Sequence, residues 1–295
     1  MISLWQRLPV VVRAVVAGVA VAAAGIVPWA MLATANQRVL LSVPWAVVPT
    51  ALYLWLLWRY LNGEGWPSSS SAARRSSLRA NAVPADAWGI ALMAGMIGMA
   101  ALLPLASLLG RLVALPVEAQ PITPPADMPF ITTFTLLVMG SIVAGVVEEA
   151  AFRGYMQGPI ERRHGPVAAL LISGVLFGAG HVNHHPSAVL AMMPFYVGVV
   201  AVYGGIAYFT NSIVPGIVLH ALGDVWSLTR LWITGQPEWQ LSAQPARTIW
   251  ETGVDGAFWG SLTAFLVFGA AAVWAFVALA DATRGSRLGG PQIVA

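Results

Sequence analysis

The stretch FITTFTLLVMGSIVAGVVEEAAFR, from Phe130 to Arg153, decides how this chain must fold. The run from Phe130 to Val147 carries no charge and is long enough to cross a bilayer as a helix. Two adjacent carboxylates, Glu148 and Glu149, end it. A charged side chain at the bilayer centre costs roughly 2.5–3.5 kcal/mol on insertion scales, so such residues are rare and usually functional. Two side by side indicate chemistry rather than packing.

The composition extends this interpretation to the whole chain. Of its 295 residues 58% are hydrophobic and only 9% are charged, and the mean hydropathy is +0.75. These values are typical of a polytopic membrane protein. Backbone polar groups in lipid must be paired internally, which restricts the fold to helices or a closed barrel. The apolar runs are continuous rather than alternating, so the sequence predicts an all-α polytopic membrane helix bundle.

We expect about eight transmembrane helices, at residues 9–34, 39–60, 87–115, 129–157, 166–183, 187–209, 212–233 and 257–281. Three regions follow from them. Residues 1–128 form an N-terminal transmembrane region with a cytoplasmic linker near 61–87, which is rich in Ser and Arg and is expected to be flexible. Residues 129–233 form a second helix bundle, which contains the ionisable residues of the apolar second half. Residues 234–295 form an outer loop, the last transmembrane helix and a cytoplasmic tail.

Charge distribution predicts the location and the orientation. The net charge is +3, and the arginines gather in the segments expected to face the cytoplasm, which favours a multi-pass protein of the cell inner membrane with both termini in the cytoplasm. The apolar stretch from Ala14 to Leu32 is too long for the apolar core of a typical signal peptide, so we expect it to be retained. The basic balance indicates contact with membrane lipid and not with nucleic acid.

The chain has no cysteine, which excludes a thiol nucleophile and a thiolate metal site. Ionisable residues instead form three clusters. In the first, Glu149 and Arg153 stand one helical turn apart with the acid first, a favourable order for an ion pair. Glu148 then stays free to act as a base or a ligand. The alternative is an ion pair at the end of a helix at the membrane surface.

The second and third clusters contain histidines. His181 follows Phe177 at the end of an apolar run and is either a site residue or a hydrogen-bonded core residue. His184 and His185 come just after it, and we interpret them as loop residues, although they are possible decoy ligands. His220 and Asp224 share one helical face and could jointly hold a metal or a water. Alternatively, Asp224 only orients the imidazole.

Depth along the helices brings these clusters together. The helices at 129–157 and 166–183 form an antiparallel hairpin that turns at His164-Gly165. At about 1.5 Å per residue, Glu148 and His181 both lie roughly 24–26 Å from this turn and would meet at one level. His220 could reach a comparable depth. The result is a polar cavity suited to activating a water against a carbonyl group.

The three motifs together resemble the CAAX protease and bacteriocin-processing family, whose intramembrane peptidases include type II CAAX prenyl endopeptidases and bacterial Abi proteins. The family pattern is Glu-Glu-x-x-x-Arg, then Phe-x-x-x-His, then His-x-x-x-Asn/Asp. It maps in order onto Glu148, Glu149 and Arg153, onto Phe177 and His181, and onto His220 and Asp224. The family domain would cover about 129–233.

The resemblance implies an intramembrane endopeptidase that acts on a membrane-associated protein or peptide. Its implied catalytic residues are Glu148, which activates water, His181, which helps it, His220 and Asp224, which stabilise the oxyanion or a metal, and Glu149 and Arg153, which support the site.

Zn²⁺ or another divalent metal is a possible cofactor, with Glu148, His181, His220 and Asp224 as its ligands. A zinc site that used all four would leave no evident base and no open position, which favours water activation without an obligatory metal. Two other functions stay open: a non-hydrolytic membrane scaffold or immunity partner, and an ion-coupled transporter.

Overall fold

The computed structural model describes residues 4–116, 123–181, 185–237, 239–240 and 246–284. Within these residues the chain is helical and has no named strand; an isolated bridge between Ala80 and Ser212 is the exception. The all-α polytopic bundle predicted from the sequence is therefore confirmed. Two short helices lie outside the main bundle, at Leu4–Arg7 (α1) and Ile249–Thr252 (α11).

The main elements agree with the predicted spans over most of their length. They are α2 (Val10–Asn36), α3 (Val47–Leu61), the 3₁₀ turn η1 (Ser68–Ser70), α4 (Ser71–Leu78), α5 (Ala85–Leu112), α6 (Phe130–Glu148), the π-helical segment η2 (Glu149–Gln157), α7 (Gly158–Ala179), α8 (Pro186–Ala191), α9 (Met193–Thr210), α10 (Val214–Thr234) and α12 (Gly256–Ala282).

Among the described residues, five helices are long and apolar enough to cross a membrane, compared with the eight spans expected. They are α2, α5, the continuous run Phe130–Ala179, α9 and α12. This run joins two predicted spans. The short apolar helix α3 starts later than expected because the residues before it form a turn. The side chain of buried Asn36 holds this turn: it accepts a hydrogen bond from the Ala46 amide and donates one to the Val43 carbonyl. The seventh expected span, α10, carries His220 and Asp224 and is not among the five.

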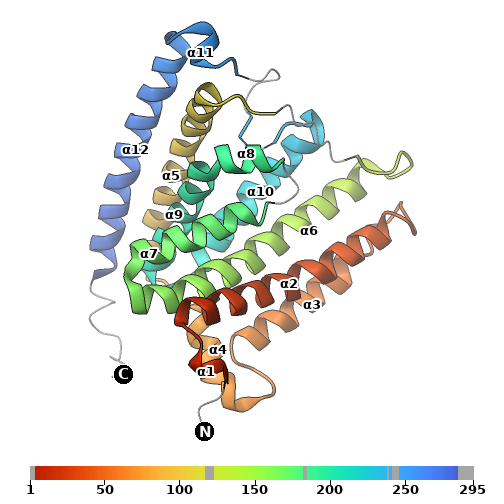
Figure 1. Cartoon of the computed structure of the whole chain (residues 1–295). Helices are drawn as coiled ribbons and strands as arrows, with labels where there is room; N and C mark the ends of the chain where they lie inside the picture. Colours follow the sequence, from red (N-terminus) through yellow and green to blue (C-terminus); the bar gives the residue numbers. More distant parts are fainter. Residues whose placement is uncertain (1–3, 117–122, 182–184, 238, 241–245, 285–295) are drawn as a thin grey trace.

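The run Phe130–Ala179 is bent into the expected hairpin. Gly165 leaves the helical conformation with φ 82° and ψ 165°, a backbone geometry that glycine adopts at little cost, and Pro166 starts the returning arm. Phe152 and Phe177, about equally far from Gly165 along the chain, meet with ring centroids 5.2 Å apart. Figure 1 shows α7 running back beside the segment that follows α6. The turn predicted at His164-Gly165 is confirmed.

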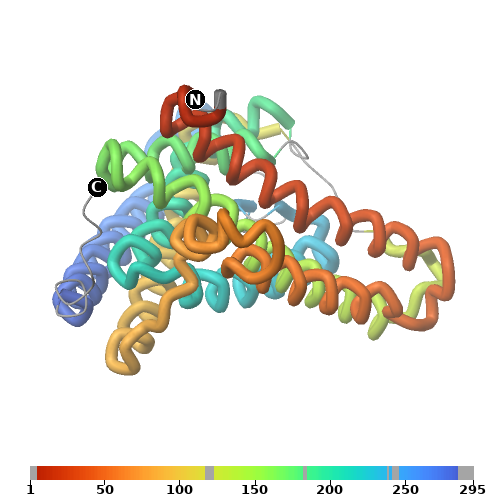
Figure 2. Tube along the Cα trace, turned by 90° about the horizontal axis from the view of Figure 1, so that it is seen from below, coloured from red at the N-terminus to blue at the C-terminus, as the bar shows by residue number. Residues whose placement is uncertain are grey.

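The remaining helices are arranged around this hairpin. Figures 1 and 2 show α2 and α3 together along one side, with α5 and α12 paired on the other. Between them lie α9, which packs on α7 and α5, and α10, which packs on α6. Gly145 lets α6 and α10 approach, because a Cβ atom there would lie 2.9 Å from the Ala221 backbone nitrogen. This contact fixes α10 next to the two glutamates.

The linker expected to be flexible is instead folded against the bundle. It forms α4, whose Arg74 is buried and donates to the backbone carbonyls of Tyr60, Glu64 and Pro67. A Cβ atom at Gly154 of η2 would lie 2.8 Å from the Ser77 carbonyl oxygen, so η2 and α4 touch at the backbone. The prediction of flexibility is wrong here because the hydrogen bonds of buried Arg74 and the apolar contacts of buried Leu78 hold the segment against the bundle.

Candidate active site

A fully buried ion pair lies where α6 passes into η2. Arg153 Nη1 is 3.2 Å from Glu149 Oε1, and neither side chain is exposed to solvent. The predicted pairing of these two residues is present, and its burial argues against a surface pair at a helix end. The π-helical segment that carries both residues was not expected from the sequence. Wide π turns inside helices occur frequently at functional sites.

His220 of α10 connects this pair to the other carboxylates. Its Nδ1 lies 2.9 Å from Glu149 Oε1, a hydrogen bond in which the ring donates because a carboxylate accepts. Its Nε2 lies 3.8 Å from Glu148 Oε2 and 3.7 Å from Asp224 Oδ2. Both distances exceed that of a direct hydrogen bond. Five of the six predicted catalytic residues thus form one cluster.

The Glu149 carboxylate packs closely against the backbone of α10 at Gly216. A Cβ atom at Gly216, near the start of α10, would lie 2.7 Å from Glu149 Oε2. Any larger residue would therefore push the carboxylate or the helix away. Glycine at this position lets α10 pack close enough for His220 to contact the buried carboxylate of Glu149.

Exposure divides the carboxylates into two kinds. The side chain of Glu149 is fully buried, whereas those of Glu148 and Asp224 keep 22% and 29% of their surface exposed. Glu148 and Asp224 can therefore meet a water or a substrate. Glu149 can act only through the groups that it contacts, His220 and Arg153.

Two aromatic rings pack against the charged groups: Phe177, which belongs to a predicted motif, and Tyr203, which does not. The Arg153 guanidinium lies over two rings, 5.1 Å from that of Phe177 and 5.2 Å from that of Tyr203. Tyr203 of α9 also stacks on His220, with centroids 5.1 Å apart and planes inclined by 8°. Sequence reasoning missed Tyr203 because a tyrosine in an apolar helix is an ordinary core residue.

The structure places His181 beside this cluster. Its Nδ1 lies 2.8 Å from the Phe177 carbonyl oxygen, and its ring packs on Phe177 and, at 4.3 Å, on Tyr196. Phe177 in turn contacts Arg153, so His181 joins the cluster through an aromatic ring. His185 is exposed and caps α8 by accepting from the Ser187 amide, which agrees with its interpretation as a loop residue. His184 lies outside the described residues.

The predicted metal ligands were Glu148, His181, His220 and Asp224. In the part of the chain that the structure describes, no three His, Asp or Glu side chains are grouped as metal ligands would be. As arranged here, the four side chains do not form a metal site. Both the ligand set and the metal itself remain predictions.

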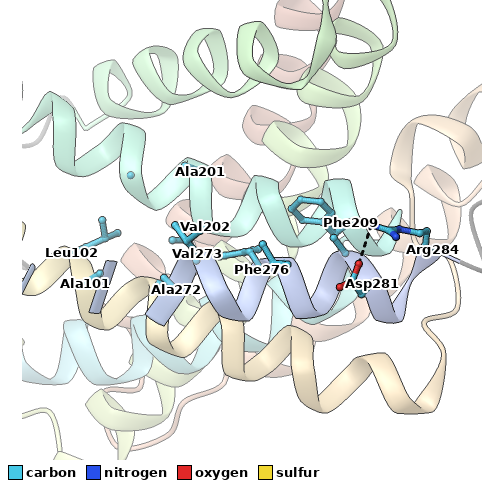
Figure 3. A pocket seen from close by; sticks show the side chains of 14 residues that line it. Ala101, Leu102, Ala201, Val202, Phe209, Ala272, Val273, Phe276, Asp281 and Arg284 are labelled. Carbon is cyan, nitrogen blue, oxygen red and sulfur yellow. Dashed lines mark ion pairs between the residues drawn. The ribbon is translucent and has the colours of Figure 1, made fainter. Parts of the chain in front are cut away.

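A separate apolar cavity of about 600 Å³ lies between α5, α9 and α12 (Figure 3). Its lining includes Leu102, Val202, Phe209 and Phe276, with the ion pair of Asp281 and Arg284 at one end. None of the predicted site residues lines it. The cavity is therefore distinct from the charged cluster.

Comparison with known proteins finds a match in the region that contains the charged cluster. Residues 130–226, about a third of the chain, match a family model described as type II CAAX prenyl endopeptidase Rce1-like. No curated protein and no solved structure matches. The matched segment begins with α6 and ends just after Asp224, so it spans the whole cluster. The resemblance inferred from the motifs is confirmed to this extent: residues 130–226 are similar to the type II CAAX prenyl endopeptidase Rce1-like family.

Proposed function

We propose that this multi-pass membrane protein is an intramembrane endopeptidase that hydrolyses a peptide bond with a water activated by Glu148. One observation carries the proposal. Glu148 and Asp224, the two partly exposed carboxylates, lie 3.8 and 3.7 Å from the same Nε2 of His220, so one water could hydrogen-bond with all three groups. The family match supports a protease.

The reaction assigns a role to each group. Glu148 accepts a proton from the water, and the resulting hydroxide attacks the carbonyl carbon of the scissile bond. A protonated His220 donates from Nε2 to the carbonyl oxygen as that oxygen gains negative charge. Glu148 then gives its proton to the amide nitrogen, the C–N bond breaks, and the products are a carboxylic acid and an amine. Asp224 orients the ring and the water.

Glu149 and Arg153 act indirectly. Glu149 fixes the orientation of His220 through Nδ1, as a carboxylate does behind a catalytic imidazole. Arg153 compensates the buried charge of Glu149. His181, next to Phe177, is proposed to help position the water, as the motif implies.

The substrate class follows from the setting of the site. Several apolar helices surround the cluster, so the scissile bond must reach it from a protein or peptide that associates with the membrane. We propose the cell inner membrane, with both termini in the cytoplasm, as the location. The family description adds a prenylated C-terminal peptide as one candidate substrate for this chain.

The test is Glu148→Gln in purified protein, assayed on a membrane-associated peptide. It removes the base but keeps the size of the side chain, so we expect a loss of at least about 100-fold in kcat. Asp281→Asn, the same chemical change on α12 far from the cluster, should leave kcat unchanged. A Glu148→Gln protein that cleaves at the wild-type rate contradicts the mechanism. A wild-type protein that moves ions without cleaving supports the transporter instead.

The cofactor is tested in the same assay. Water activation by Glu148 without an obligatory metal predicts that a strong chelator leaves kcat unchanged. It also predicts less than stoichiometric metal in the purified protein. Loss of activity with the chelator and its recovery with Zn²⁺ would favour a metallopeptidase.

A further inference from the structure

Two tyrosines of α9 support the two histidines of the candidate site. Tyr196 packs on His181 with ring centroids 4.3 Å apart, and Tyr203 stacks on His220 at 5.1 Å. The tyrosines are seven residues apart, close to two helical turns, so they share one face of α9. Both are buried, at 1% and 3% of their surface. No motif of the family pattern lies on α9.

Tyr203 contacts the charged cluster on two sides. Its ring lies nearly parallel to that of His220, and the Arg153 guanidinium lies 5.2 Å from its centroid. The rotation of the His220 ring about its side-chain bonds is therefore limited by Glu149 at Nδ1 and by Tyr203 on the ring face. The hydrogen bond holds Nδ1, but coupled rotation about the two side-chain bonds can still tilt the ring plane. The stack with Tyr203 opposes this tilt and so keeps Nε2 near Glu148 and Asp224.

We propose that Tyr203 is a positioning residue for His220, and that α9 thereby contributes to a site whose charged groups come from other helices. The expected effect of Tyr203 on kcat rests on the proposed function. Its expected effect on the orientation of the His220 ring rests on geometry alone. The aromatic ring of Tyr203, rather than its hydroxyl group, carries the role, because the stack involves the ring face.

Two substitutions separate the ring from the hydroxyl. Tyr203→Phe keeps the stack and should retain kcat within about twofold, whereas Tyr203→Leu should lower kcat about three- to tenfold with little change in KM. Phe209→Leu is the matched control: it makes the same kind of change on the same helix, but Phe209 faces Phe276 and the apolar cavity (Figure 3). It should leave kcat unchanged even where it lowers Tm.

A second measurement does not depend on peptidase activity. Diethyl pyrocarbonate modifies accessible imidazoles, and mass spectrometry of the peptide that contains His220 gives the rate. We expect modification of His220 to be at least twice as fast in Tyr203→Leu as in wild type and in Tyr203→Phe. The exposed His185 serves as the internal reference. This comparison stays decisive even where the peptidase hypothesis itself fails with Glu148→Gln.

Two outcomes overturn the proposal. One is a Tyr203→Leu protein with wild-type kcat and wild-type reactivity of His220. The other is a Tyr203→Phe protein that loses as much activity as Tyr203→Leu, since the hydroxyl group would then be the important part.

Discussion

At the scale of single residues, the buried pair of Glu149 and Arg153 makes the sharpest prediction. Neither side chain is exposed, so removing one partner leaves an uncompensated charge in the interior. Arg153→Met should lower the free energy of unfolding by about 3–5 kcal/mol. Glu149→Gln with Arg153→Met should recover part of this loss, because the glutamine oxygen can still accept from His220. Thermal denaturation in detergent measures both changes.

Arg59→Met is the control for this prediction. Arg59 and Glu64 also form an ion pair, but 47% and 42% of their side-chain surfaces are exposed. Exposed pairs contribute about 0–1 kcal/mol, so this change should be nearly neutral. Equal Tm shifts for Arg153→Met and Arg59→Met would show that the buried pair contributes no more to stability than the exposed pair.

At the scale of elements, the crossing of α6 and α10 decides the geometry of the site. A Cβ atom at Gly145 would lie 2.9 Å from the Ala221 backbone nitrogen, and Ala221 directly follows His220. Gly145→Ala must therefore displace α10 and carry His220 away from Glu149. Because misplacement by about 1 Å can cost about 100-fold in rate, we expect a loss of at least about tenfold in kcat. Kinetics of the purified variant measures it.

The control for the helix crossing is Gly269→Ala on α12. A Cβ atom at this glycine meets nothing within 4 Å. Alanine also has the higher helix propensity of the two residues, so Gly269→Ala should be neutral or slightly stabilising. A Gly145→Ala protein with wild-type kcat would mean that α10 moves without affecting the chemistry.

At the scale of the whole molecule, the arrangement of the ends predicts a topology. Figure 1 places α1, α4 and the end of α12 toward one end of the bundle, and α11 at the other. The chain has no cysteine, so single cysteines report position directly. Ser76→Cys in α4 should react with an impermeant maleimide only from the cytoplasmic side, and Val254→Cys only from the opposite side. Labelling of both positions from the same side would contradict the predicted orientation.

The sequence by itself determined the features that depend on local pattern. Apolar runs of sufficient length predicted the long apolar helices, the break at His164-Gly165 predicted the hairpin, and the spacing of Glu149 and Arg153 predicted their pairing. It also predicted that Glu149, rather than Glu148, would pair with the arginine. Each of these features involves residues within one helix or at one turn.

Only the tertiary structure decided which helices meet and through which faces. It brought Glu149 to His220, 71 residues away, placed Tyr203 behind that ring, and folded α4 onto η2. Helices that are apolar on every side carry no stripe that fixes their rotation, so hydropathy cannot assign their contacting faces. Close approaches at Gly145 and Gly216 set those rotations, and these depend on the packing of partners distant in the sequence.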